Sequence, residues 1–171
     1  MPAFPPPRPA GFTLVELTVV LLVLAIGSAM VVPLFNGNEV TQLRTAAQLL
    51  AADLDAAKAE SLTHADDPRV VVFDLTNHIY QIAPSSTPAT AITNVYDKKP
   101  YIVQFGKGRA SALPDVTISS VDLNGDNQLG FGIYGQLDQA VPATITLAAD
   151  GATVTLTIDP ATGEATIGDI Q

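Results

Sequence analysis

A single apolar run dominates the N-terminal part of the chain. The run covers the 24 residues of 12–35, and its only polar side chains are those of Thr13, Glu16, Thr18 and Ser28. As a helix it would be roughly 36 Å long at about 1.5 Å per residue, enough to cross a hydrocarbon core of about 30 Å. The pattern therefore predicts a transmembrane helix over 12–35.

After Pro33 the apolar positions recur in alternating steps of three and four residues. Such a period is typical of an amphipathic helix that buries one face. The helix is predicted to resume near Asn36 and to end at Asp67, because the residue before a proline disfavours the α region. Its apolar face is predicted to hold Val40, Leu43, Ala47, Leu50, Leu54, Ala57 and Ser61, and its polar face Gln42, Arg44, Gln48, Asp55, Lys58 and Glu60.

From residue 68 onward the chain has the pattern of β-strands, rich in Val, Ile, Thr and Tyr and separated by turn residues. Asp150 with Gly151 and the stretch 159–163 are predicted turns, since Gly and Asp tolerate a positive φ. The stretch 84–100 has no clear period and is predicted to be a long exposed loop. The predicted strands are 69–74, 78–83, 101–105, 116–121, 129–134, 143–148, 153–158 and 164–167.

Together these elements predict an α+β fold, with a long N-terminal hydrophobic helix packed on a C-terminal antiparallel β-sheet domain. The expected organisation is a leader at 1–11, the transmembrane helix at 12–35, its amphipathic continuation at 36–67 and a globular domain at 68–171.

Composition narrows the classes of protein that fit this plan. The 171-residue chain has a formal net charge of −9, which argues against general nucleic-acid binding through clustered Lys and Arg. It has no cysteine, so neither a disulfide framework nor a thiolate metal site is possible.

Glu16 is the feature of the apolar run that needs a physical explanation. A carboxylate costs on the order of 2.5–3.5 kcal/mol at the centre of a membrane helix and less near its end. No cation lies within the run, but cleavage after Gly11 would give Phe12 a free α-ammonium one helical turn from Glu16. Between staggered neighbouring helices, such an amine and carboxylate would select a register. Cleavage by a signal peptidase near Ala25–Ala29 is the competing interpretation.

The stretch GFTLVE, from Gly11 to Glu16, resembles the processing signal of type IV pilins and type II secretion pseudopilins. The resemblance implies that a prepilin peptidase cuts after Gly11 and methylates Phe12. It also implies that Glu16 pairs with a neighbouring subunit's amine during assembly and that Pro33 bends the helix. The leader departs from the family pattern, because Arg8 is its only basic residue.

The C-terminal half is similar to the GspH/FimT group of minor pseudopilins. The similarity lies in FGIYG at 131–135, a TITL strand, a DG turn, VTLTID and TGEATI. Many major pilins have a C-terminal disulfide, so the absence of cysteine favours a pseudopilin over a major pilin.

Two short stretches look like ligand-binding motifs. The sequence GFGIYG at 130–135 satisfies G-x-G-x-x-G, but a dinucleotide site needs those glycines between a strand and a helix. Here they fall in a β-like segment and no helical pattern follows. The segment 122–133 begins like a calcium loop, with oxygen ligands at Asp122, Asn124 and Asp126. It lacks the glycine and glutamate of an EF-hand, so an ordinary turn between strands is preferred to a weak calcium site.

No sequence signature of catalysis is present. His64 and His78 lie on different predicted elements, His64 near a helix end and His78 on a strand, and no nucleophile motif accompanies them. We therefore expect a protein that is not an enzyme and has no cofactor or resident metal.

The sequence leaves three hypotheses. The first is a pseudopilin of a type II secretion filament, single-pass in the inner membrane with its C-terminal domain in the periplasm. Its expected partners are the prepilin peptidase and other pseudopilins or pilins, which it meets through the N-terminal helix. The second is a minor pilin of a type IV pilus, for adhesion or DNA uptake. The third is a signal-anchored β-domain that binds a ligand.

Overall fold

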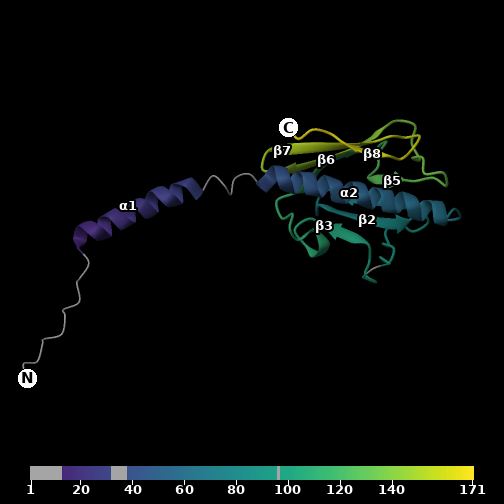
Figure 1. The fold of residues 1–171 in the computed structure, drawn as a ribbon. Helices are drawn as coiled ribbons and strands as arrows, with labels where there is room; N and C mark the ends of the chain where they lie inside the picture. The colour runs from purple at the N-terminus through teal and green to yellow at the C-terminus, as the bar shows by residue number, and fades with distance from the viewer. Residues whose placement is uncertain (1–12, 32–37, 96) are drawn as a thin grey trace, which may run out of the picture. The chain divides into compact units, whose positions relative to one another are not determined.

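The computed structural model describes residues 13–31, 38–95 and 97–171 (Figure 1). The chain divides into two compact units, 1–37 and 38–171. The first unit holds helix α1 (Leu14–Val31), and the second holds helix α2 (Asn38–Thr63) and eight described strands.

The strands form two antiparallel sheets. The first sheet has the order β3-β2-β1-β5 and the second β4-β6-β7-β8. Sequence neighbours such as β6 and β7 pair through tight turns, in this case Asp150 and Gly151 with φ of 45° and 90°, which suits a two-residue hairpin loop. The strand bounds are β1 Arg69–Asp74, β2 Ile79–Pro84, β3 Ile102–Gln104, β4 Thr117–Asp122, β5 Gln128–Gly130, β6 Ala143–Ala149, β7 Ala152–Ile158 and β8 Ala165–Ile167.

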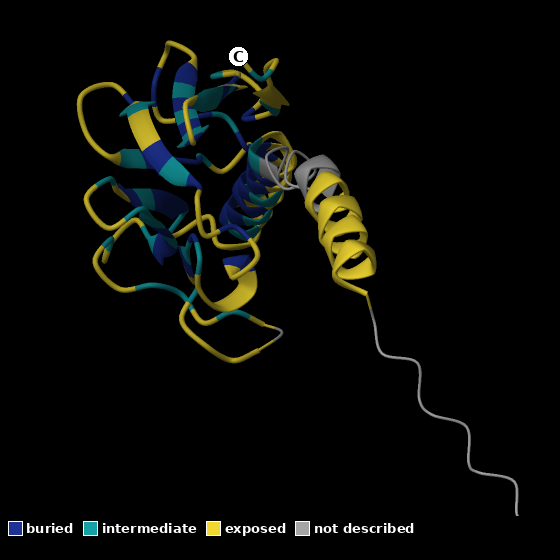
Figure 2. Ribbon diagram, turned by 90° about the vertical axis from the view of Figure 1, so that its left-hand side faces the viewer, coloured by how far each residue is buried: buried dark blue, intermediate teal, exposed yellow. Residues whose placement is uncertain are grey.

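Helix α2 packs on both sheets, as the dark blue side of the helix in Figure 2 shows. The strand residues that face it alternate along β6 and β7, whose inward side chains include Ile145, Leu147 and Leu156. The predicted α+β class is confirmed: a helix packs on antiparallel sheets. Six of the seven predicted core positions of this helix are fully buried, namely Leu43, Ala47, Leu50, Leu54, Ala57 and Ser61.

The structure corrects three details of α2. Val40, predicted for the core, is 48% exposed, whereas Gln42, predicted for the polar face, is buried and donates from Nε2 to Asp115 Oδ2 at 3.0 Å. The helix ends at Thr63 rather than Asp67. Thr, His and Asp are poor helix formers, and here the His64 carbonyl accepts from the Asp67 N–H in a turn.

Two predicted strands also differ. The strand predicted at 129–134 stops at Gly130, because Phe131 makes only an isolated bridge and the chain then turns at Gly132–Gly135. His78 is not on a strand. It lies in the β1–β2 turn with φ 51°, and its Nδ1 accepts a hydrogen bond from the Ile118 N–H at 3.3 Å.

Candidate functional site

Helix α1 is apolar on all sides. Its described large side chains are exposed by between 49% (Val20) and 79% (Leu14). A globular protein hides such side chains in a core or against an apolar partner. In unit 1 itself nothing described covers them, so α1 is the first candidate site. Within the described part of the chain, no helix reaches the combined length and hydropathy that a membrane crossing requires.

The start of α1 explains part of the role of Glu16. Thr13 precedes the helix, and its Oγ1 accepts the backbone N–H of Glu16 at 3.2 Å, while its carbonyl accepts the N–H of Leu17 at 3.1 Å. A threonine at the N-cap followed three positions later by glutamate is the sequence of a capping box. A carboxylate in the first turn is also favoured by the positive end of the helix dipole. Glu16 thus sits where a charge costs least, independently of any partner.

The other residues predicted for processing and assembly lie outside the described part of the structure. These are Gly11, Phe12 and Pro33, so the geometry of cleavage and of the predicted bend stays a prediction. Gly27 does lie within α1, and the helix continues through it to Val31.

The globular unit contains a buried polar cluster that the sequence patterns missed. Asp53 of α2, 3% exposed, accepts from Tyr80 Oη at 2.6 Å and from Tyr101 Oη at 3.0 Å, and it pairs with Arg109 Nη2. The guanidinium also lies over the Tyr101 ring, 5.1 Å from its centroid. These four residues, the Asp53 network, join α2 to β2, to the start of β3 and to the 3-10 turn at Gly108–Ala110.

Electrostatics within the Asp53 network favour neutral tyrosines and a charged arginine. Burial, followed by the Asp53 carboxylate, raises the pKa of Tyr80 well above 10.0. Burial also raises the pKa of Tyr101. The pKa of Arg109 is raised because hydrogen bonds and attraction from Tyr101 and Asp53 outweigh the lowering effect of burial. Both tyrosine hydroxyls and the guanidinium have the Asp53 carboxylate as a partner. Because it joins α2 to the other elements in this way, the network has the arrangement of a structural clamp.

The calcium candidate has the form of a hairpin turn. Asn124 and Gly125 have φ of 62° and 97° between the bridged residues Leu123 and Asp126. Asp126 Oδ1 accepts the Gln128 N–H at 3.0 Å, so that oxygen already has a donor. Among the described residues no three His, Cys, Asp or Glu side chains are grouped to hold a metal ion.

The glycines of GFGIYG lie at closely packed positions and in a turn. A Cβ on Gly130 would collide with the Asp138 side chain, and one on Gly132 with that of Gln136. Gly135 has φ 83°, and its Cβ would meet the Lys58 side chain at 2.8 Å. Close packing against these side chains and the positive φ of Gly135 account for the glycines, and the stretch does not open a helix as a dinucleotide site would.

The comparisons with known proteins bear on the N-terminus alone. The family model for the prokaryotic N-terminal methylation motif matches residues 7–32. No curated protein and no solved structure matches the chain significantly. The matched segment contains GFTLVE and all of α1. The chain therefore carries the prokaryotic N-terminal methylation motif, which supports a type IV pilin-like or pseudopilin subunit.

Proposed function

We propose that this chain is a pseudopilin of a type II secretion filament, with a GspH/FimT-like globular domain. The observation that carries the proposal is the methylation motif at 7–32, continuous with a helix that is apolar on all sides and begins with a capped Glu16. Before assembly the whole apolar run 12–35, which is longer than α1, anchors the subunit in the inner membrane with the globular unit in the periplasm. During assembly this run leaves the lipid and packs among the helices of neighbouring subunits.

Processing supplies the charge that assembly needs. A prepilin peptidase cuts after Gly11, and the new α-ammonium of Phe12 lies one turn before Glu16. In the filament the ammonium of one subunit pairs with Glu16 of a neighbour. Removing one partner of a buried pair typically costs about 3–5 kcal/mol, which exceeds the small cost of a carboxylate near a helix end.

Mass spectrometry of the mature N-terminus tests the proposal. We expect a start at Phe12 with an added methyl group and no conversion in Gly11→Leu. A mature start near Ala29 or Met30 would exclude the pilin-type pathway and favour a signal peptide.

Glu16 variants test the pairing. The cap uses the backbone N–H of residue 16, which donates to Thr13 Oγ1, so Glu16→Gln and Glu16→Ala both keep this bond and both lose the charge. We expect both variants to be processed and both to cross-link poorly to neighbouring subunits. Wild-type cross-linking of both variants would contradict the pairing.

The alternative of a minor pilin in a type IV pilus shares this processing and this helix. Co-purification separates the two, since a pseudopilin accompanies secretion components and a minor pilin accompanies the pilus shaft.

A further inference from the structure

The loop between β5 and β6 carries two exposed apolar side chains at the tip of a tight turn. The Gly135 N–H donates to the Gly132 carbonyl at 2.9 Å, so Ile133 and Tyr134 are the two central residues of the turn. Ile133 is 41% exposed and Tyr134 is 82% exposed. We call this feature the Ile133–Tyr134 turn.

The turn is held firmly by its surroundings. The Gly132 N–H donates to the Gln136 carbonyl at 2.8 Å, and the Tyr134 N–H donates to Gln136 Oε1 at 3.1 Å. Gly135 lies against the Lys58 side chain of α2, and its carbonyl lies so close to Gly163 that no Cβ fits there. A rigid aromatic tip loses little conformational entropy on docking, which favours contact with a partner.

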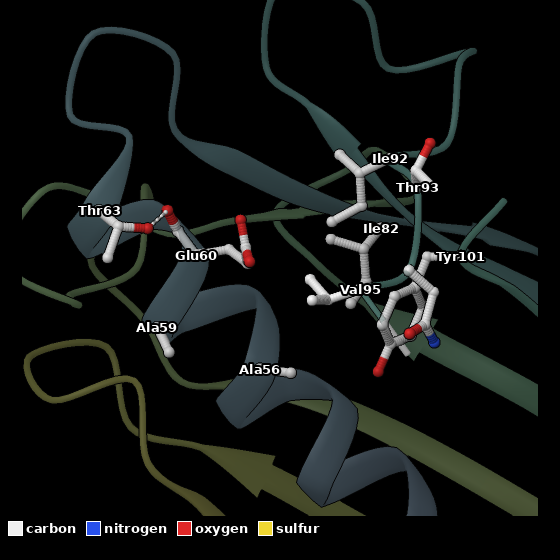
Figure 3. A pocket seen from close by; sticks show the side chains of 10 residues that line it. Ala56, Ala59, Glu60, Thr63, Ile82, Ile92, Thr93, Val95 and Tyr101 are labelled. Atoms are coloured by element: carbon white, nitrogen blue, oxygen red, sulfur yellow. Dashed lines mark hydrogen bonds between the residues drawn. The ribbon is translucent and has the colours of Figure 1, made fainter. Parts of the chain in front are cut away.

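A pocket lined largely by apolar side chains, which suits the apolar tip of the turn, lies elsewhere on the same unit. It has a volume of about 360 Å³ and lies between α2 and the β2–β3 region. Figure 3 shows the apolar side chains of Ile82, Ile92 and Val95 facing Ala56 and Ala59 across it, with the Glu60 side chain on one wall. The two alanines leave room that larger helix residues would fill. We call this the α2–β2 pocket.

The turn and the pocket lie on opposite sides of α2. Lys58, which touches the turn, is roughly 150° around the helix from the centre of the pocket-lining residues of α2. Figure 1 likewise shows β5 on one side of α2 and β2 and β3 on the other. A projection and a hollow on different faces of one molecule permit a head-to-tail contact, which repeats along an open helical array.

The charges beside the two features are complementary. Lys58 borders the turn and makes no ion pair among the described residues, and Glu60 borders the pocket. Glu60 Oε2 lies 3.9 Å from Arg69 and 3.3 Å from His64, which is exposed. In a head-to-tail contact the lysine of one copy approaches the glutamate of the next, and this orients the approach.

We propose that the Ile133–Tyr134 turn of one copy inserts into the α2–β2 pocket of a second copy of this chain. One tyrosine and one isoleucine bury a few hundred Å², well below the roughly 1,200–2,000 Å² of a stable interface. The contact therefore acts where another attachment already holds copies together, which raises their effective concentration. The biological role of this contact rests on the filament function proposed above, whereas the contact itself needs only two folded globular units.

Cysteine cross-linking tests the contact cleanly, because the natural chain has no cysteine. Two full-length copies with different tags are co-expressed, one with Ile133→Cys and the other with Ala59→Cys, and membranes are oxidised. Ile133→Cys keeps Tyr134 as the anchor. We expect a mixed disulfide at several-fold the yield of a control pair in which Thr157→Cys, exposed on β7, replaces Ile133→Cys.

Two further variants show whether the disulfide reports this contact. Adding Tyr134→Ala to the first copy removes the anchor, and adding Ala56→Leu to the second fills the pocket. Each should reduce the mixed disulfide to the control yield. A yield for the original pair equal to that of the Thr157→Cys control, or one unaffected by both additions, would overturn the proposal.

The same sample judges the filament role separately. Mass spectrometry of the cross-linked band gives its N-terminus, so a start other than Phe12 rejects the processing pathway while the disulfide yield still decides the contact.

Discussion

Removal of the Asp53 carboxylate should destabilise the globular unit strongly. The carboxylate is the shared acceptor of Tyr80, Tyr101 and Arg109. In Asp53→Ala the hydroxyl of Tyr80, a residue that is 1% exposed, is left buried without its acceptor, at a cost of about 1–3 kcal/mol. Tyr101 loses one hydrogen bond, about 1 kcal/mol more.

The ion pair between Asp53 and Arg109 contributes less than a fully buried pair would. The Arg109 side chain is 35% exposed, so water can solvate the guanidinium when Asp53 is removed. Its share therefore falls toward the 0–1 kcal/mol of surface pairs rather than the 3–5 kcal/mol of fully buried ones. The sum predicts that Asp53→Ala lowers the free energy of unfolding by about 2–5 kcal/mol.

Urea unfolding of the full chain in mild detergent measures this loss, followed by circular dichroism and by tyrosine fluorescence, since the chain has four tyrosines and no tryptophan. Asp55→Ala is the matched control, an exposed aspartate two positions away on α2, and should change stability by less than about 0.5 kcal/mol.

A double variant sharpens the test. Asp53→Leu leaves the Tyr80 hydroxyl unpaired, and adding Tyr80→Phe removes that hydroxyl, so the second change should restore part of the stability. Two results would show that the Asp53 network does not stabilise the fold. The first is that Asp53→Ala lowers the free energy of unfolding no more than Asp55→Ala does. The second is that Tyr80→Phe destabilises the Asp53→Leu background as much as it destabilises the wild type.

Two further predictions follow from the same unit. Because the pKa of Tyr80 is raised above 10.0 in the folded state, its stabilising contribution is complete below pH 10 and is lost as the pH rises above it, since only the unfolded chain then releases the proton. Urea unfolding between pH 8 and pH 11 should show the free energy of unfolding of the wild type falling with pH, and falling less steeply in Tyr80→Phe. An equal fall in both proteins would contradict the prediction. Gly163→Ala should lower the free energy of unfolding in urea more than Gly151→Ala does. Both residues have a positive φ, which costs an alanine about 1–2 kcal/mol of strain. Only at Gly163 would the new Cβ also strike a backbone atom, the carbonyl oxygen of Gly135. Equal losses would show that the loop yields.

The elements of this protein that repeat a simple period could be predicted from the sequence. The strand at 153–158 and the buried stripe from Leu43 to Ser61 follow directly from alternation and from helical spacing, because burial of one face sets the pattern. The hairpin at Asp150 and Gly151 was predictable for a local reason, since few residues accept its positive φ. The methylation motif, too, is contiguous and needs no fold to be detected.

Long-range packing decided the rest. Asp53 lies in the buried stripe three positions after Leu50, which is a sequence signal for a paired core carboxylate, but its partners are 27, 48 and 56 residues away. Strand 129–134 is the exception, because it ends at Gly130 for a local reason: the chain turns at Gly132–Gly135, and the strand pattern did not reveal this turn. His78 lies in the β1–β2 turn and not on the predicted strand, and its ring nitrogen accepts a hydrogen bond from Ile118, 40 residues away in the other sheet. The sequence by itself therefore determined the elements and the processing motif, whereas only tertiary contacts determined which polar groups are buried, because a partner distant in the chain leaves no period in the pattern.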